Sequence, residues 1–129
     1  MKHFSERKIL IADDEPSVRL LVKRLLSENY IVLEASNGEE AVSVTRTEKP
    51  NLILMDILMP KMDGYTACYT IKTDEVTKGI PVVMLTAIAY KLNKQLGQAM
   101  NADGYITKPF SSQDLMDTIS QFLPASKKI

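Results

Sequence analysis

Five side chains of this 129-residue chain combine carboxylates, an ammonium and a hydroxyl, the groups that bind divalent cations and phosphate. They are Asp13, Asp14, Asp56, Thr86 and Lys108. Three carboxylates held close together repel one another, which raises the pKa of at least one of them. Mg²⁺ relieves that repulsion, because it accepts one or two carboxylates, waters and a substrate phosphate as ligands. If the fold brings them together, these residue types predict phosphate chemistry at a metal site.

Asp56 stands at the end of a continuous apolar run, residues 52–55, and precedes a proline-containing loop that closes at Asp63 and Gly64. An apolar run bounded by turn residues is typical of a strand buried on both faces. A carboxylate at the end of such a strand is costly to desolvate unless it is paired. Asp56 therefore needs either a partner or a chemical role.

The other polar candidates also follow short apolar runs. Strands are predicted at residues 8–12, 30–35, 52–56, 80–85 and 103–107. Asp13 and Asp14 follow the first strand, Thr86 follows the fourth, and Lys108 follows the fifth. Nothing charged directly follows the second strand, which is therefore predicted to lie at an edge of the sheet, with the first and third strands as neighbours.

Helical patterns separate these strands. The first predicted helix begins at Pro16 and ends near Asn29, which is expected to adopt a left-handed conformation at the helix end. Its apolar stripe consists of Val18, Leu21, Val22, Leu25 and Leu26. Further helices are predicted after the N-cap Asn37, at residues 65–71, at residues 92–100 and after the N-cap Ser111.

Strands that alternate with helices imply parallel strands, right-handed crossovers and helices on both faces of the sheet. The predicted fold is a three-layer α/β structure, a doubly wound, flavodoxin-like sheet of five parallel strands in the order 2-1-3-4-5 with five helices. Ligands of such sheets bind beyond the carboxyl ends of the strands, where the strand order reverses. The five polar candidates are all predicted to lie at that edge.

Composition excludes several classes of protein. Sixteen basic and sixteen acidic residues cancel, which argues against direct nucleic-acid binding. No apolar stretch approaches the ~20 residues of a membrane span, and none near the start is of the signal-peptide type. The single cysteine, Cys68, cannot form an internal disulfide and fits a reducing cytoplasm. We expect one cytoplasmic domain over residues 1–129, with its core at about 8–123, either free-standing or part of a longer regulator.

A metal, an ammonium and a hydroxyl arranged around one carboxylate suit a dianionic group that approaches it. This arrangement predicts phosphoryl transfer with Asp56 as the nucleophile and an aspartyl phosphate as the product. In-line transfer depends on positioning and charge neutralisation more than on a dedicated base, so the lack of a suitable histidine or glutamate base is no objection.

The motifs Asp13-Asp14, Asp56 within Asp-Ile-Leu-Met-Pro-Lys-Met-Asp-Gly, Thr86-Ala87, and Lys108-Pro109-Phe110 occur in this order, each at a strand end. Together they closely resemble the receiver domain of two-component response regulators, in the single-domain form of the chemotaxis regulators. The resemblance covers residues from about 8 to 123.

The resemblance implies that Asp56 accepts a phosphoryl group, in a phosphorelay, from the phosphohistidine of a sensor histidine kinase or phosphotransfer protein. It further implies a Mg²⁺ (or Mn²⁺) ion held by Asp14, Asp56 and the backbone carbonyl of Leu58, with Asp13 holding a metal-bound water. Such a domain catalyses only its own phosphorylation and dephosphorylation and is not otherwise an enzyme.

The remaining roles implied by the resemblance concern the phosphoryl group and its readout. Lys108, on a cis bond to Pro109, contacts the phosphoryl oxygens, as do the backbones of Leu58 and Ala87. Thr86 swings its hydroxyl toward the phosphoryl group, and Tyr105 rotates inward behind it. This coupling alters the surface of the fourth helix, fifth strand and fifth helix, which then controls a protein partner or output domain or forms a phosphorylation-dependent homodimer.

Two positions that tune phosphoryl lifetime in the family are apolar here. They are Leu58, two residues after Asp56, and Ile88, two residues after Thr86. Because neither side chain can orient an attacking water, we expect the phosphorylated protein to hydrolyse slowly.

Three other functions agree less well with these residues. A phosphatase with an aspartyl nucleophile typically has Asp-x-Asp after the first strand, but Glu15 occupies the second of these positions. A flavin-binding module needs a Ser/Thr/Gly-rich phosphate loop there, whereas the three consecutive acids at 13–15 repel phosphate. A degenerate receiver that acts only as an interaction module is disfavoured because all five site side chains are present.

Overall fold

The structure is a computed structural model that describes residues 6–87 and 101–124. Its elements in chain order are β1 (Lys8–Ala12), α1 (Pro16–Leu26), β2 (Ile31–Ala35), α2 (Gly38–Glu48), β3 (Leu52–Asp56), α3 (Gly64–Thr73), β4 (Val82–Thr86), β5 (Gly104–Thr107) and α5 (Ser112–Phe122). The predicted strands are thus all present, each within two residues of its predicted ends.

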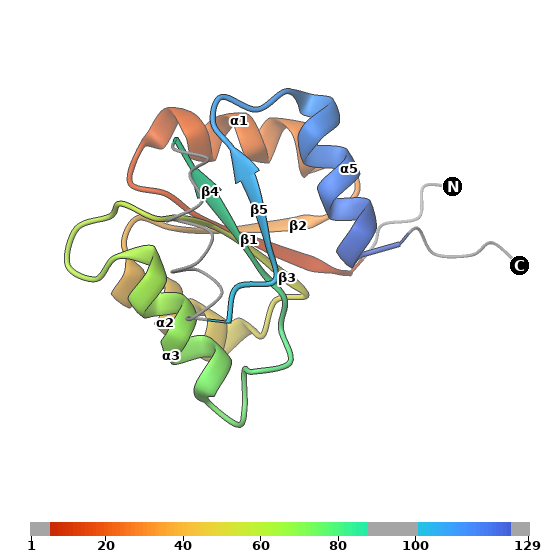
Figure 1. The fold of residues 1–129 in the computed structure, drawn as a ribbon. Helices are drawn as coiled ribbons and strands as arrows, with labels where there is room; N and C mark the ends of the chain where they lie inside the picture. The colour runs from red at the N-terminus through yellow and green to blue at the C-terminus, as the bar shows by residue number, and fades with distance from the viewer. Residues whose placement is uncertain (1–5, 88–100, 125–129) are drawn as a thin grey trace, which may run out of the picture.

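The five strands form one sheet in the order β2-β1-β3-β4-β5, and every neighbouring pair is parallel. Helices α1 and α5 cover one face of the sheet, and α2 and α3 cover the other (Figure 1). Alternate residues of a strand point to opposite faces. Leu10 accordingly joins the core under α2 and α3, whereas Ile9 and Ile11 join the core under α1 and α5. The predicted fold class and strand order are confirmed.

Local caps explain where three helices begin. The side chain of Asn37 accepts a hydrogen bond from the backbone N–H of Glu40 at the start of α2, and Asp63 accepts one from Thr66 at the start of α3. Ser111 and Asp114 form a reciprocal capping box at α5. These caps satisfy backbone donors that the first helical turn leaves unpaired. The predicted N-caps Asn37 and Ser111 are confirmed.

Two predictions for α1 are wrong. Leu21 was expected to face the core but is 45% exposed. Of the predicted apolar stripe, Val22 and Leu26 are the residues buried against the sheet, and this rotation of α1 leaves Leu21 at the surface. The helix ends at Leu26, and Ser27, its C-cap, keeps right-handed angles with φ −64°. Asn29 is not among the described residues with positive φ. Backbone bonds from Asn29 and Tyr30 to the carbonyl of Leu26 close this end without a left-handed residue.

The fourth helix expected at residues 92–100, with the tuning residue Ile88 before it, lies outside the described residues. Among the residues that are described, no helix is both long enough and apolar enough to span a membrane.

Candidate functional site

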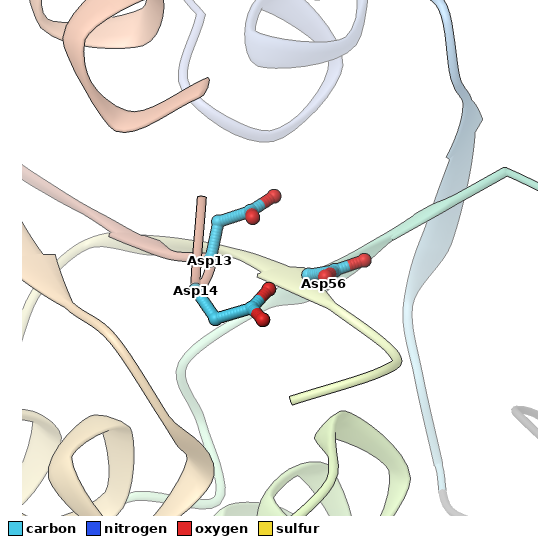
Figure 2. Close-up of side chains that lie close together, drawn as sticks. All are labelled: Asp13, Asp14 and Asp56. Atoms are coloured by element: carbon cyan, nitrogen blue, oxygen red, sulfur yellow. The ribbon is translucent and has the colours of Figure 1, made fainter. Parts of the chain in front are cut away.

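Three carboxylates gather at the carboxyl edge of the sheet. β1 and β3 are neighbours with Ala12 paired to Met55, so the residues that follow, Asp13 and Asp56, lie side by side. One oxygen from each of Asp13, Asp14 and Asp56 lies within 4.8 Å of the other two. Figure 2 shows Asp13 and Asp14 at the end of β1 and Asp56 at the end of β3. Asp13 is fully buried and Asp56 nearly so, whereas Asp14 is exposed.

Lys108 extends into this cluster from the end of β5. Its Nζ lies 2.8 Å from Asp13 Oδ2, 3.4 Å from Asp56 Oδ1 and 3.8 Å from Glu15 Oε1. Its backbone N–H donates to the carbonyl of Thr86 at 2.6 Å, and its bond to Pro109 is cis, as predicted. The fold therefore brings Lys108 into direct contact with two of the three predicted acids, Asp13 and Asp56.

The loop after Asp56 is held in place by close backbone contacts. The N–H of Gly64 donates to the carbonyl of Ile57 at 2.7 Å, and the N–H of Gly38 donates to the carbonyl of Met62 at 2.9 Å. A Cβ on Gly64 would lie 2.1 Å from the carbonyl oxygen of Asp56, and one on Gly38 would lie 2.2 Å from that of Met62. Both positions thus need glycine because another backbone segment passes too closely for any side chain.

Three further predicted site residues, Leu58, Thr86 and Ala87, line a cleft of about 390 Å³ beside the acids. It is lined by Asp14, Glu15, Asp56, Ile57, Leu58, Thr86, Ala87 and Lys108. Thr86 is buried at the end of β4, while Leu58, at 73% exposed, and Ala87 are open to solvent. Tyr105, half-buried in the middle of β5, packs against the core under α2 and α3 and does not line this cleft.

Burial and the neighbouring charges shift the pKa values of Asp56 and Lys108. Burial, and then the charge of Asp13, raise the pKa of Asp56 to about 6, although Lys108 partly offsets them. Burial lowers the pKa of Lys108, but its hydrogen bond to Asp13 and the charges of Asp13 and Asp56 outweigh that effect and raise it overall. The lysine is therefore charged at neutral pH, and an additional cation would favour the ionised form of Asp56.

The donor set fits a hard divalent cation. Three carboxylates at the ends of two adjacent strands can supply oxygen ligands, and one of them is exposed, which leaves room for waters and a phosphate. Burial and the neighbouring charge of Asp13 raise the pKa of Asp56, and a bound cation would offset both effects. Among the described residues the chain thus offers an acidic site suited to Mg²⁺.

Two further residues lie beside this site. Glu15, which directly follows the two aspartates in sequence, is exposed, lines the cleft and approaches Lys108 Nζ to 3.8 Å. Arg19 of α1 donates from Nη1 to the backbone carbonyl of Asp13 at 2.7 Å. An arginine on a helix face is common, so no sequence signal marks Arg19 as part of the site.

Comparisons with known proteins agree with this geometry. Residues 9–120 match the family model described as the response regulator receiver domain. A probable transcriptional regulator, ycf27, from Pyropia yezoensis is 41% identical over 125 residues, which cover 96% of this chain and 50% of that protein. The chain spans about half the length of these curated relatives.

Two solved structures are similar along their whole length. The chemotaxis protein CheY4 of Vibrio cholerae has a TM-score of 0.87 and 31% identity, with 92% of this chain and 100% of that chain covered. The receiver domain of a sensor histidine kinase from Pseudomonas aeruginosa PAO1 has a TM-score of 0.85 and 25% identity, with 94% and 100% covered. The latter was solved with a magnesium ion coordinated in its active-site cleft.

Proposed function

This chain belongs to the response regulator receiver domain family, and from that premise we propose that Asp56 accepts a phosphoryl group from a phosphohistidine. The donor is a sensor histidine kinase or a phosphotransfer protein. The observation that supports this role best is the contact set of Asp56, which lies beside two carboxylates and within 3.4 Å of the Lys108 ammonium at an open cleft.

In the proposed transfer an Asp56 oxygen forms a bond to phosphorus while the bond from phosphorus to the donor's imidazole nitrogen breaks. The electron pair of the broken bond stays on that nitrogen. Asp56 attacks as its carboxylate, which its pKa of about 6 allows at neutral pH. Lys108 neutralises charge on the phosphoryl oxygens. Leu58 and Ala87 line the same cleft, and their backbones are proposed to contact those oxygens as well.

The acids also hold the metal in this proposal. Asp14, Asp56 and the backbone carbonyl of Leu58 are the ligands, and Asp13 holds a metal-bound water. Bound Mg²⁺ supplies positive charge to the carboxylates and to the transferred phosphoryl group. Support comes from the three convergent oxygens and from the magnesium ion in the similar receiver of P. aeruginosa.

The readout of phosphorylation is proposed to start at Thr86. Its side chain borders the cleft from the end of β4, so its hydroxyl can turn toward a phosphoryl group on Asp56. Tyr105 then moves inward on neighbouring β5 and alters the surface of β5 and α5, together with the predicted fourth helix. That surface binds a protein partner or output domain or supports a homodimer. A coupling of about 1–3 kcal/mol is enough to shift such an equilibrium.

Incubation with acetyl phosphate and Mg²⁺, followed by intact mass spectrometry, tests the proposal. The wild-type protein is expected to gain one phosphoryl group, and Asp56→Asn is expected to gain none. Asp117→Asn, which alters an exposed carboxylate on α5 outside the cleft, serves as the matched control and should behave as wild type. Phosphorylation of Asp56→Asn would contradict the assignment of the acceptor, and phosphate release without a phosphoprotein would favour the phosphatase.

A further inference from the structure

Arg19 connects the acidic turn after β1 to the edge strand β2. Its Nη1 donates to the backbone carbonyl of Asp13 at 2.7 Å, and its Nε donates to Glu34 Oε1 at 3.1 Å. The arginine side chain is only 19% exposed. Lys23, one helical turn further along α1, binds the other Glu34 oxygen at 3.0 Å. Among the described residues, the ion pairs of Asp13 and Asp56 are formed with Lys108 and not with Lys23.

Every polar atom of Asp13 has a partner in this arrangement. Its N–H donates to the carbonyl of Ala35 at 3.0 Å, and its own carbonyl accepts from Arg19. Its two carboxylate oxygens accept from the N–H of Glu15 at 2.9 Å and from Lys108 at 2.8 Å. Two consecutive residues of β2 therefore hold the Asp13 main chain, Ala35 directly and Glu34 through the guanidinium of Arg19.

We propose that Arg19 is a positioning residue of the acidic cleft, which holds the Asp13 main chain so that the carboxylates of Asp13 and Asp14 are placed for Mg²⁺. This inference rests on the proposed function, because it takes Mg²⁺ as the cation of the cleft. Removal of the guanidinium leaves the carbonyl of the fully buried Asp13 without its donor, and the turn must shift to recover one. Groups that orient metal ligands commonly change metal affinity by about 10- to 100-fold when they are removed.

The sign of the effect separates positioning from simple electrostatics. Arg19 is a cation near a cation site, so its charge alone opposes Mg²⁺ binding, and its loss should then tighten binding. If Arg19 positions Asp13, its loss should weaken binding. Lys23→Ala is the matched control, because it removes a cation bound to the same Glu34 carboxylate and leaves the bond between Arg19 and Asp13 in place.

The experiment measures Mg²⁺ affinity by isothermal titration calorimetry for the wild type, Arg19→Ala and Lys23→Ala, with folding checked by circular dichroism. Arg19→Ala is expected to bind Mg²⁺ about tenfold more weakly than wild type. Lys23→Ala is expected to bind Mg²⁺ within about twofold of wild type, because it changes only a half-exposed charge. If Arg19→Ala does not fold, Arg19→Lys replaces it in the experiment. One ammonium cannot keep both bonds of the guanidinium, so Mg²⁺ binding by Arg19→Lys is expected to be several-fold weaker than by wild type.

Unchanged or tighter binding by the folded Arg19 variant would overturn the inference, and so would an equal loss in Lys23→Ala. The wild-type protein distinguishes this failure from that of the proposed function. A wild type that binds no Mg²⁺ and gains no phosphoryl group on Asp56 contradicts the proposed function itself. A wild type that does both, alongside an unaffected Arg19 variant, contradicts only the role of Arg19.

Discussion

Lys108 Nζ lies 2.8 Å from Asp13 Oδ2, so the lysine at the end of β5 pairs most closely with the fully buried acid. Its distance to the proposed phosphoacceptor, Asp56 Oδ1, is longer at 3.4 Å. The lysine therefore has a structural task, which is to compensate the charge of a carboxylate without solvent access. An arriving phosphoryl group would compete with Asp13 for the same ammonium.

Replacement of Lys108 by methionine is expected to separate metal binding from phosphorylation. The variant loses the cation that competes with the metal, so its affinity for Mg²⁺ should be equal to or tighter than that of wild type. Its phosphorylation by acetyl phosphate should fall at least about tenfold. Because the buried Asp13 carboxylate keeps only the hydrogen bond from the N–H of Glu15, the free energy of unfolding without metal should fall by about 2 kcal/mol or more. Calorimetry, intact mass spectrometry and urea unfolding measure these changes.

Lys78→Met is the control for this prediction, because Lys78 forms an exposed pair with Glu75 three residues earlier. It should leave all three quantities close to wild type, since exposed pairs contribute little to stability. A Lys108→Met variant as stable as wild type would show that Asp13 does not depend on the lysine.

The raised pKa of Asp56 predicts a pH-dependent stability difference between wild type and Asp56→Asn. The folded-state pKa of about 6 exceeds the usual carboxyl value of 3.8, so between these values the folded protein binds more protons than the unfolded chain. Ionisation of Asp56 therefore destabilises the fold as pH rises through this window. Without metal, Asp56→Asn should be more stable than wild type above pH 6, by up to about 3 kcal/mol, and the difference should shrink as the pH falls and vanish below the unfolded-state pKa of 3.8.

Urea unfolding in the presence of EDTA at several pH values measures this difference. Added Mg²⁺ should also stabilise the wild type more at pH 7 than at pH 5, because protons compete for the Asp56 carboxylate. A difference between wild type and Asp56→Asn that does not depend on pH would contradict the electrostatic description of the site.

Gly64→Ala is expected to damage the loop that follows Asp56. Its Cβ would lie 2.1 Å from the carbonyl oxygen of Asp56, and a backbone atom cannot move aside as the end of a side chain can. We expect a loss of about 3 kcal/mol of unfolding free energy together with weaker Mg²⁺ binding. The same change at Gly79, where nothing lies within 4 Å of an added Cβ, should be nearly neutral. Thermal or urea unfolding of the two variants provides the test, and equal stability would contradict it.

Leu58→Asn is expected to shorten the lifetime of the phosphorylated protein. The leucine side chain borders the cleft and is 73% exposed, so an amide there can reach a water near Asp56. One hydrogen bond of about 1 kcal/mol to the attacking water accelerates hydrolysis about fivefold. Loss of phosphoprotein with time, followed by mass spectrometry, measures the rate. Leu20→Asn, which alters an exposed leucine of α1 outside the cleft, should leave the rate unchanged. An unchanged rate in Leu58→Asn would mean that this position does not limit water attack.

The sequence alone was sufficient for the strands, three-layer architecture and site edge, because these depend on local patterns. Apolar runs such as residues 52–55 identify buried strands, and Asn37 and Ser111 mark helix starts through bonds to backbone groups three residues away. In a parallel sheet the carboxyl ends of all strands lie at the same edge. Asp13, Asp56 and Lys108 could therefore be placed together before any contact was known.

Only the tertiary structure decided which of these groups touch. The bond between Lys108 and Asp13 joins residues 95 positions apart, and the bond between Arg19 and the Asp13 carbonyl depends on how α1 packs against β2. Leu21 shows the same limit, since α1 packs with Val22 and Leu26 inward and leaves that leucine exposed. Periodicity indicates which face of a helix is apolar. The exact rotation of that helix and the contacts of a long side chain are set by packing between distant segments.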